Sequence, residues 1–222
     1  MLSISSALRL GAKLTVMLML VLPGTGIAAP GDMLQFEGES DGRLYEVDTR
    51  SPEPIIEYWL KIDLLPESGD RPVVQVFGDG RVNVHRPVYM KDAGDYELVL
   101  TQDQLKDLLR SFGKRGLMDF DKTKYRSKRA KAAEAKLKKT GSYTVISDSM
   151  TTTIDVRLDG YRARNNAQKR KDFRKRIRVK DIEHDARQLT DANEVQDLAA
   201  SVTRIRDLMR DTIERGWRND AR

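Results

Sequence analysis

Alternating apolar and polar residues predict strands in the first half of the chain. From Glu57 to Leu64, apolar side chains recur at every second position, which is the period of a strand with one buried face. Residues 73–84 then form two valine-rich runs around Gly78-Asp79-Gly80, residue types that accept the positive φ of a tight turn. A further short strand is predicted at residues 96–100. The valine-rich runs predict a β-hairpin in which Val74 and Val76 lie opposite Val82 and Val84.

Apolar residues spaced three and four apart predict two helices that each bury one face. The first begins at Thr101, because Thr101 and Gln104 have the spacing of a capping box. Its buried stripe is Leu105, Leu108, Leu109 and Phe112, and a hydrophobic plug of Leu117, Met118 and Phe120 follows. The second begins near Asp191 and Glu194, which have the same capping-box spacing, and ends at Gly216. Its buried stripe is Leu198, Val202, Ile205, Met209 and Ile213.

Weaker patterns lie between the two predicted helices. Residues 143–145, 154–158 and 177–182 each alternate enough to predict a strand. A turn is predicted at Asp159-Gly160-Tyr161. The stretch 162–175 is predicted to be a long polar connection, and the strand after it carries basic residues between its apolar positions.

The first 28 residues have the pattern of a cleavable signal peptide. Arg9 and Lys13 precede an apolar core at residues 14–22. Gly26-Ile27-Ala28 then places small residues at the two positions that a signal peptidase inspects, so we expect cleavage after Ala28. The apolar core is shorter than the roughly 20 residues that a membrane-spanning helix needs. The mature protein is therefore predicted to be periplasmic or secreted.

These patterns predict one α+β domain over residues 57–216, with an antiparallel sheet and two helices packed on one face. Residues 29–56 are rich in glycine and acidic side chains and lack a clear period, so they predict a loosely ordered leader. Residues 217–222 predict a polar tail. Within the domain, residues 125–141 combine alanine and lysine, which favour helix, with only Leu137 to bury. This insertion is predicted to be an exposed helix or a mobile loop.

Positive charge is concentrated in the middle of the chain. The whole sequence carries a net charge of +6, but residues 122–180 hold 20 Lys and Arg against five acids, a local excess of +15. Without the two cations of the signal peptide, the rest of the mature chain carries about −11. The protein is therefore an acidic body with a basic middle, and only the basic middle is predicted to attract an anionic partner.

The order of these elements resembles that of a family of small exported bacterial domains of unknown function. Its members share a strand ending in a Gly-Asp-Gly hairpin, a capped helix closing in a hydrophobic plug, a Thr-rich strand and a terminal helix. The corresponding stretches here are residues 76–82, 105–120, 148–156 and 198–209. The resemblance implies the α+β fold and brings no catalytic residues with it. The basic stretches 125–141 and 162–175 depart from the family pattern, so chemistry specific to this protein is expected there.

No motif for catalysis, cofactor binding or metal binding is found in the sequence. The chain contains no cysteine, which excludes disulfides and thiol ligands. His85 and His184 lie far apart and are too few for a typical zinc site, and no Gly-x-Ser-x-Gly nucleophile motif is present. Gly78-Asp79-Gly80 lacks the length and the lysine of a phosphate-binding loop. We therefore expect a noncatalytic protein without cofactor or metal, and an uncharacterised enzyme is the alternative.

Basic residues of the middle region are the candidate anion-binding residues. They are Lys128, Arg129, Lys131, Lys136, Lys138, Lys139, Lys169, Arg170, Lys171, Arg174, Lys175 and Arg176. In a bacterial envelope the accessible anions are lipid headgroups, lipopolysaccharide phosphates and acidic polymers, and their binding to Lys and Arg releases counterions. Sequence-specific nucleic-acid binding is disfavoured, since only Tyr125, Tyr161 and Phe173 interleave with the charge.

Two other interpretations of the basic residues stay open. In one, they form a solvated face or pair with the acidic body. In the other, an exposed strand edge such as residues 174–182 accepts a protein partner by strand addition. The expected function is that of an exported envelope protein with a binding or structural role, whose partner is an anionic envelope component or an acidic protein.

Overall fold

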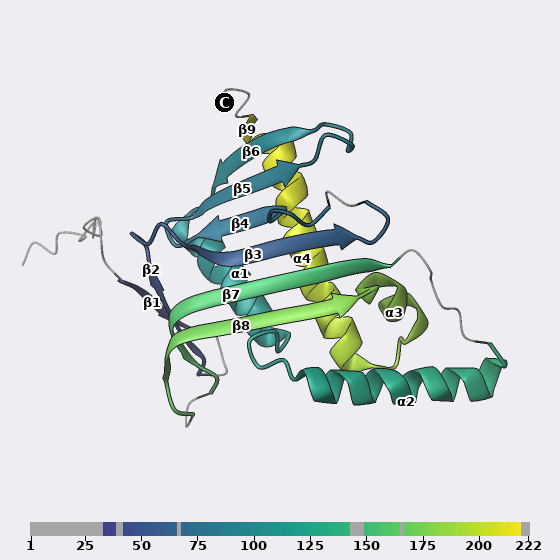
Figure 1. Cartoon of the computed structure of the whole chain (residues 1–222). Helices are drawn as coiled ribbons and strands as arrows, with labels where there is room; N and C mark the ends of the chain where they lie inside the picture. Colours follow the sequence, from purple (N-terminus) through teal and green to yellow (C-terminus); the bar gives the residue numbers. More distant parts are fainter. Residues whose placement is uncertain (1–32, 39–41, 66–67, 143–148, 165–166, 219–222) are drawn as a thin grey trace, which may run out of the picture.

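The computed structural model describes residues 33–38, 42–65, 68–142, 149–164 and 167–218. Over these residues the chain forms an antiparallel sheet of nine strands and four helices, which confirms the predicted α+β class (Figure 1). The predicted signal peptide and the strand predicted at residues 143–145 lie outside the described residues.

All strand pairs in the sheet are antiparallel. The strands are β1 (Met33–Glu37), β2 (Leu44–Asp48), β3 (Pro54–Ile62), β4 (Val74–Phe77), β5 (Arg81–Arg86), β6 (Gly94–Val99), β7 (Met150–Arg162), β8 (Arg170–Lys180) and β9 (Trp217–Arg218). Their order is β1-β2-β7-β3-β4-β5-β6-β9, and β8 pairs with β7. The long strand β7 therefore joins β2 and β3 to β8.

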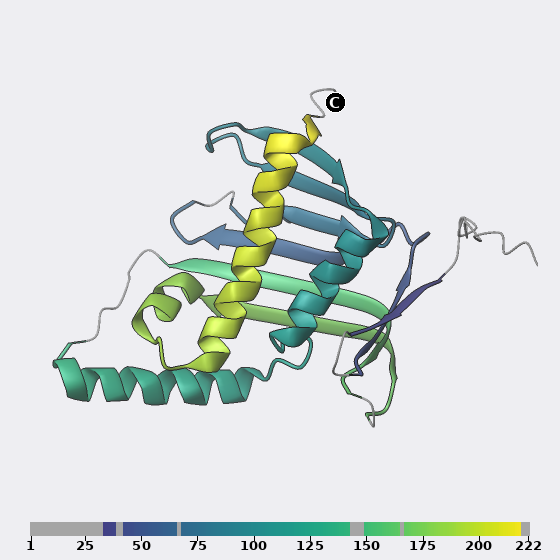
Figure 2. The same ribbon diagram turned by 180° about the vertical axis from the view of Figure 1, so that it is seen from behind.

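Two of the four helices cover one face of the sheet, as the sequence predicts. They are α1 (Gln102–Lys114) and α4 (Asn193–Arg215), and Figure 2 shows both crossing the strands on the same side. The opposite face, called here the outer face, has no helix over it (Figure 1). The short helix α3 (Ile182–Gln188) contacts α4, and α2 (Lys122–Thr140) lies along the end of the sheet that holds β8.

The hydrophobic core lies between the sheet and the two covering helices. Side chains from the inner face of β2 to β8 meet the apolar stripes of α1 and α4 there. Burying one Leu, Val or Phe side chain contributes roughly 1.5–3 kcal/mol, so these contacts dominate the stability of the fold. The least exposed members include Val47, Val74, Val82, Leu109, Phe112, Met118, Ile154, Val156, Val195 and Val202.

The predicted hairpin is confirmed in its register. Val74 pairs with Val84 and Val76 with Val82, so the valines of the two strands face one another as expected. Gly80 has a φ of 93°, a conformation that glycine adopts without the steric cost of a side chain. A Cβ atom at Gly80 would also overlap the carbonyl oxygen of Leu100.

The two main helices begin in different ways. At α1, the Thr101 side chain accepts from Gln104 N at 3.2 Å and the Gln104 side chain accepts from Thr101 N at 2.8 Å, which confirms the predicted capping box. The capping box predicted at Asp191 and Glu194 is wrong: α4 begins after Ala192, which makes no side-chain cap. The predicted end at Gly216 is confirmed.

The stretch expected to be a loosely ordered leader, residues 29–56, contributes two strands where it is described. Tyr45 and Val47 of β2 are buried in the core, and the rings of Phe36 and Tyr45 stack at 4.9 Å. The expectation was wrong because each strand is only five residues long, which leaves too few alternating positions to stand out in the sequence. The folded domain thus begins before Glu57.

The turn predicted at Asp159-Gly160-Tyr161 is also wrong, since β7 continues through it. Gly160 lies at a close approach of side chains instead, because a Cβ atom there would displace the Glu46 carboxylate of β2. The polar connection predicted at 162–175 is correspondingly shorter, because β8 already begins at Arg170.

Two further boundaries near the C-terminus differ from expectation. Ile182 belongs to α3 and not to the last strand, because Asp181 adopts a φ of 51° and turns the chain out of β8. The predicted tail pairs with the sheet, since Trp217 of β9 lies opposite Glu97 of β6. The domain therefore extends beyond Gly216.

Candidate functional site

The twelve candidate anion-binding residues lie in two places, on α2 and on β8 with its preceding residue. Both elements are at the same end of the sheet (Figure 1). The two are close at the start of α2, where the positive charge of Lys175 acts on the carboxylate of Asp121. The structure thus brings together two basic segments that are separated by β7 in the sequence.

Strand β8 divides its side chains between two environments. Phe173, Ile177 and Val179 are buried against the core. Arg174, Arg176, Arg178 and Lys180 alternate with them and are exposed on the outer face. Because alternate residues of a strand are about 6.8 Å apart, the strand spaces these cations evenly. Arg178 was not among the predicted residues, although the period of two along β8 is a signal for it.

Three of the predicted cations near β8 are engaged in contacts within the fold. Arg174 donates to both carboxylate oxygens of the buried Asp155, at 2.7 and 3.3 Å, and this hydrogen bonding raises the pKa of Arg174. Lys169 donates to Glu46 at 2.7 Å. Arg170 pairs with Asp119 at 3.3 Å and its guanidinium lies 4.6 Å from the centre of the Phe173 ring. These three residues connect β8 to the rest of the molecule.

Three of the predicted cations on α2 also have carboxylate partners. Arg129 donates to both oxygens of Asp185 on α3, whose side chain is only 1% exposed. Lys128 lies 3.8 Å from Glu194, and Lys138 lies 2.7 Å from Glu134 one helical turn away. The Arg129 pair attaches α2 to the domain, because Asp185 is buried there.

The start of α2 is held by two further contacts. Asp121 accepts hydrogen bonds from the backbone N–H groups of Thr123 and Lys124, at 2.7 and 3.0 Å, and this lowers its pKa. Tyr125 is buried and its ring lies 5.3 Å from that of Phe120. Leu137, the one apolar residue that the sequence offered for burial in this segment, is about half exposed, in line with the exposed helix that was one of the two expectations. Hence α2 is attached through its first half.

The remaining predicted cations make no ion pair with any described carboxylate. They are Lys131, Lys136 and Lys139 on α2, and Lys171, Lys175 and Arg176 on β8. With Arg178 they make up seven cations, defined here as the unpaired basic set. The structure therefore divides the predicted residues into six that stabilise the fold and six that remain available to a ligand.

The two histidines lie in unrelated surroundings. His85 Nδ1 lies 2.7 Å from Asp95, and Arg71 contacts both side chains. His184 is on α3, and its Nε2 is buried without a partner among the described residues. In the described part of the chain, no three His, Asp or Glu side chains gather into a metal ligand set, and no helix is long and apolar enough to cross a membrane.

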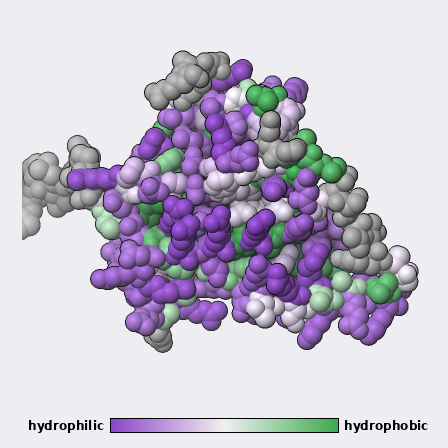
Figure 3. Space-filling view, in the orientation of Figure 1, coloured by the Kyte–Doolittle hydropathy of each residue, from purple (hydrophilic) through white to green (hydrophobic). Residues whose placement is uncertain are grey.

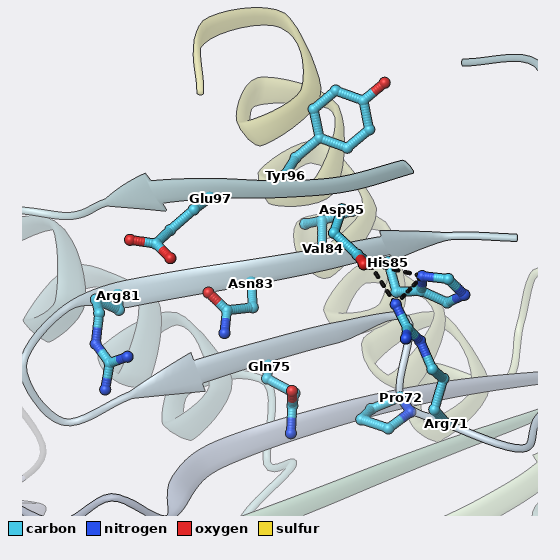
Figure 4. Close-up of a pocket in the computed structure, with 10 residues that line it drawn as sticks. All are labelled: Arg71, Pro72, Gln75, Arg81, Asn83, Val84, His85, Asp95, Tyr96 and Glu97. Atoms are coloured by element: carbon cyan, nitrogen blue, oxygen red, sulfur yellow. Dashed lines mark hydrogen bonds and ion pairs between the residues drawn. The ribbon is translucent and has the colours of Figure 1, made fainter. Parts of the chain in front are cut away.

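The outer face carries a second feature that the sequence did not reveal. The face is largely hydrophilic (Figure 3), and a hollow of about 630 Å³ lies over β4, β5 and β6 (Figure 4). Its polar lining residues are Arg71, Gln75, Arg81, Asn83, His85, Asp95 and Glu97. Their side chains come together only because three strands are in register, and no short motif records that arrangement.

Comparisons of the chain with protein-family models, with curated proteins and with solved structures give no match.

Proposed function

We propose that this protein is an exported, noncatalytic binding protein of the bacterial envelope whose ligand is a polymer or surface bearing phosphate or other anionic groups. The observation that carries the proposal is the unpaired basic set on β8 and α2. Seven cations without carboxylate partners at one end of a domain attract a polyanion, because each neutralised phosphate releases a condensed counterion.

The geometry of β8 supports a multivalent anion as the ligand. Arg176 and Arg178 project from the same face about 6.8 Å apart, and the guanidinium of each suits bidentate contact with phosphate. Lys175 projects from the opposite face toward the start of α2. The cations of β8 thus present to both sides of the strand, which favours an extended ligand over a single small ion.

The exposed helix α2 extends the same charge beyond the sheet. Lys131, Lys136 and Lys139 lie on a helix that buries few side chains, so these ammonium groups reach solvent without disturbing the core. Export is supported by the sequence of residues 1–28, and the anionic polymers of an envelope are then the accessible partners.

Retention on immobilised heparin and on lipopolysaccharide across a salt gradient tests this function. The full chain is compared with a variant carrying Lys→Gln or Arg→Gln at the seven unpaired positions. A control neutralises three exposed cations elsewhere, Lys61, Lys91 and Arg204, and is compared with the variant after the shift in eluting salt concentration is divided by the number of charges removed. We expect steeply salt-dependent retention that the first variant loses and the control keeps. Weak retention that is equal in all three proteins would contradict the proposal.

The pairing of β8 favours strand addition as a second candidate function. Among the described strands, β8 pairs with β7 alone, so its other edge has backbone groups available to a partner strand. The same lysines and arginines on an edge strand discourage indiscriminate pairing. An increase in mass on addition of an acidic extended peptide, measured by light scattering, would support strand addition, and an unchanged mass would count against it.

A further inference from the structure

We infer that the hollow on the outer face binds a neutral saccharide, at a site separate from the unpaired basic set. The hollow has the volume of a small-molecule site, for which roughly 300–1,000 Å³ is typical. Its floor and walls are polar, unlike the mainly apolar lining of most ligand pockets, so the ligand it fits is itself polar.

The floor of the hollow is a row of side chains that runs across the strands. Gln75 pairs with Asn83, Asn83 with Glu97, and Glu97 with Trp217 of β9. Directly paired residues project to the same face, and neighbouring strands are about 4.8 Å apart. An amide, a second amide, a carboxylate and an indole therefore follow one another at even spacing, and Figure 4 shows the first three directed into the hollow.

Two members of this row have hydrogen-bonding groups that the protein does not satisfy. Gln75 donates to Glu57 at 3.2 Å. The Asn83 amide, by contrast, has no partner among the described residues, and its Oδ1 is buried. The Glu97 carboxylate beside it makes no ion pair or side-chain hydrogen bond with any described residue. Since a buried polar group without a partner costs about 1–3 kcal/mol, Asn83 Oδ1 is suited to a ligand that supplies a hydrogen bond, and the partly exposed Glu97 carboxylate beside it offers further acceptors.

The charges around the hollow argue against an anionic ligand. Arg71 contacts Asp95, which is also bonded to His85, and Arg81 donates to Asp79 at 2.8 Å. The guanidinium groups at the two ends of the hollow are therefore already paired with carboxylates. The unsatisfied atoms in the floor include the acceptors Asn83 Oδ1 and Glu97, so the ligand must donate hydrogen bonds. Hydroxyl groups donate to such acceptors and also accept from arginine and amide N–H groups.

The indole of Trp217 favours a saccharide over other hydroxyl-bearing ligands. Trp217 is about half exposed and pairs with Glu97 from the next strand, just beyond the residues that line the hollow. A sugar ring has an apolar C–H face that packs on an aromatic ring while its hydroxyls turn to polar neighbours. A cationic amine would also suit Glu97 and Trp217, so a polyamine is included among the probes of the test and binding of the polyamine alone counts against the saccharide.

Titration of the full chain with neutral oligosaccharides tests the inference. The neutral probes are cellohexaose, maltohexaose and fully N-acetylated chitohexaose, and spermidine is the cationic probe. Binding is measured by tryptophan fluorescence and by calorimetry. We expect at least one oligosaccharide to bind with little dependence on salt. The variants Asn83→Leu and Trp217→Phe should each weaken that binding at least tenfold, whereas Gln102→Leu on exposed α1 should leave it unchanged.

Several outcomes would overturn the saccharide site. They are no binding of any oligosaccharide, unchanged binding by both variants, or binding of spermidine alone. If Asn83→Leu does not fold, as judged by circular dichroism, Trp217→Phe and Glu97→Gln decide the question. The variant lacking the unpaired basic set should bind the oligosaccharide normally. Failure of heparin retention and failure of saccharide binding are thus separate results.

Discussion

The two basic segments carry similar charge but are attached to the protein in different ways. Strand β8 is in register with β7 over its whole length and buries Phe173, Ile177 and Val179 in the core. Helix α2 is held by the buried ring of Tyr125, the cap at Asp121 and the Arg129–Asp185 pair, all in its first half. Strand β8 is therefore part of the sheet, whereas α2 lies outside the sheet and is held to the domain through its first half.

This difference decides how each segment presents its cations. In β8 the backbone spacing is set by the sheet, so little conformational freedom is lost when an anion binds. In α2 the second half makes few contacts with the domain, and its lysines keep their rotamer freedom until a ligand orders them. The same number of charges should therefore contribute more to affinity from β8 than from α2.

The largest expected effect is on the stability of the segment that belongs to the sheet. Phe173→Ala removes a buried ring that lies 4.7 Å from the Tyr161 ring and under the Arg170 guanidinium. We expect a loss of about 3–5 kcal/mol in the free energy of unfolding, because the substitution leaves a cavity. Urea denaturation measures this loss, and Lys171→Ala, at an exposed position of β8, should change the free energy of unfolding by less than about 0.5 kcal/mol. Similar values for the two variants would mean that β8 is not anchored by its apolar side.

A smaller effect is expected where α2 is attached. Arg129→Ala leaves the Asp185 carboxylate, 1% exposed, without its cationic partner. We expect a loss of about 3 kcal/mol in the free energy of unfolding, because removing one partner of a buried ion pair leaves the other charge uncompensated. Proteolysis within α2 should become faster while the sheet stays protected. Lys128→Ala, whose ion pair is solvent-exposed, is the matched control and should cost less than about 1 kcal/mol. Unchanged proteolysis in Arg129→Ala would show that other contacts hold the helix.

The sequence predicted those elements whose signals are local. The valine hairpin and the capped start of α1 depend on residues within a few positions of one another, and both are confirmed. Strands β1 and β2 were missed although they pair with each other locally, because each is only five residues long and the second partner of β2, strand β7, lies in a distant part of the chain. Gly160 was misinterpreted because it pairs in the sheet with Glu46, which is more than a hundred positions away in the sequence.

The candidate site was predictable in composition but not in detail. The sequence identified which segments are basic, yet Arg174 and Lys169 turned out to be bound to Asp155 and Glu46. Such pairing depends on contacts between distant strands, so counting charges along the chain overestimates the cations available to a ligand. Arg178 was missed because the candidates were taken from the continuous basic runs, whereas Arg178 alternates with apolar residues inside the predicted strand.

The next prediction compares how much β8 and α2 each contribute to the affinity for heparin. Neutralising Lys171, Lys175 and Arg176 to Gln on β8 should lower the salt concentration of elution from heparin more than neutralising Lys131, Lys136 and Lys139 on α2. Both triple variants remove the same charge, so counterion release alone predicts equal shifts. A larger shift for β8 would show that fixed spacing matters. Equal shifts would mean that only total charge matters.

The smallest expected effect is on the first turn of α2 in acid. The N–H groups of Lys124 and Thr123 hold the pKa of Asp121 below its usual value, so the ionised cap stabilises the folded state. Because the folded pKa is lowered, this stabilisation is complete above the unfolded value of about 3.9 and is lost as the pH falls through the folded pKa. The first turn of α1 is capped by Thr101, which does not titrate. Amide exchange between pH 5 and 2, corrected for intrinsic rates, should thus accelerate at Thr123 and Lys124 but not at Gln104, and Asp121→Ser should abolish the difference. Parallel acceleration at both helices would indicate that acid loosens the whole domain and not the attachment of α2.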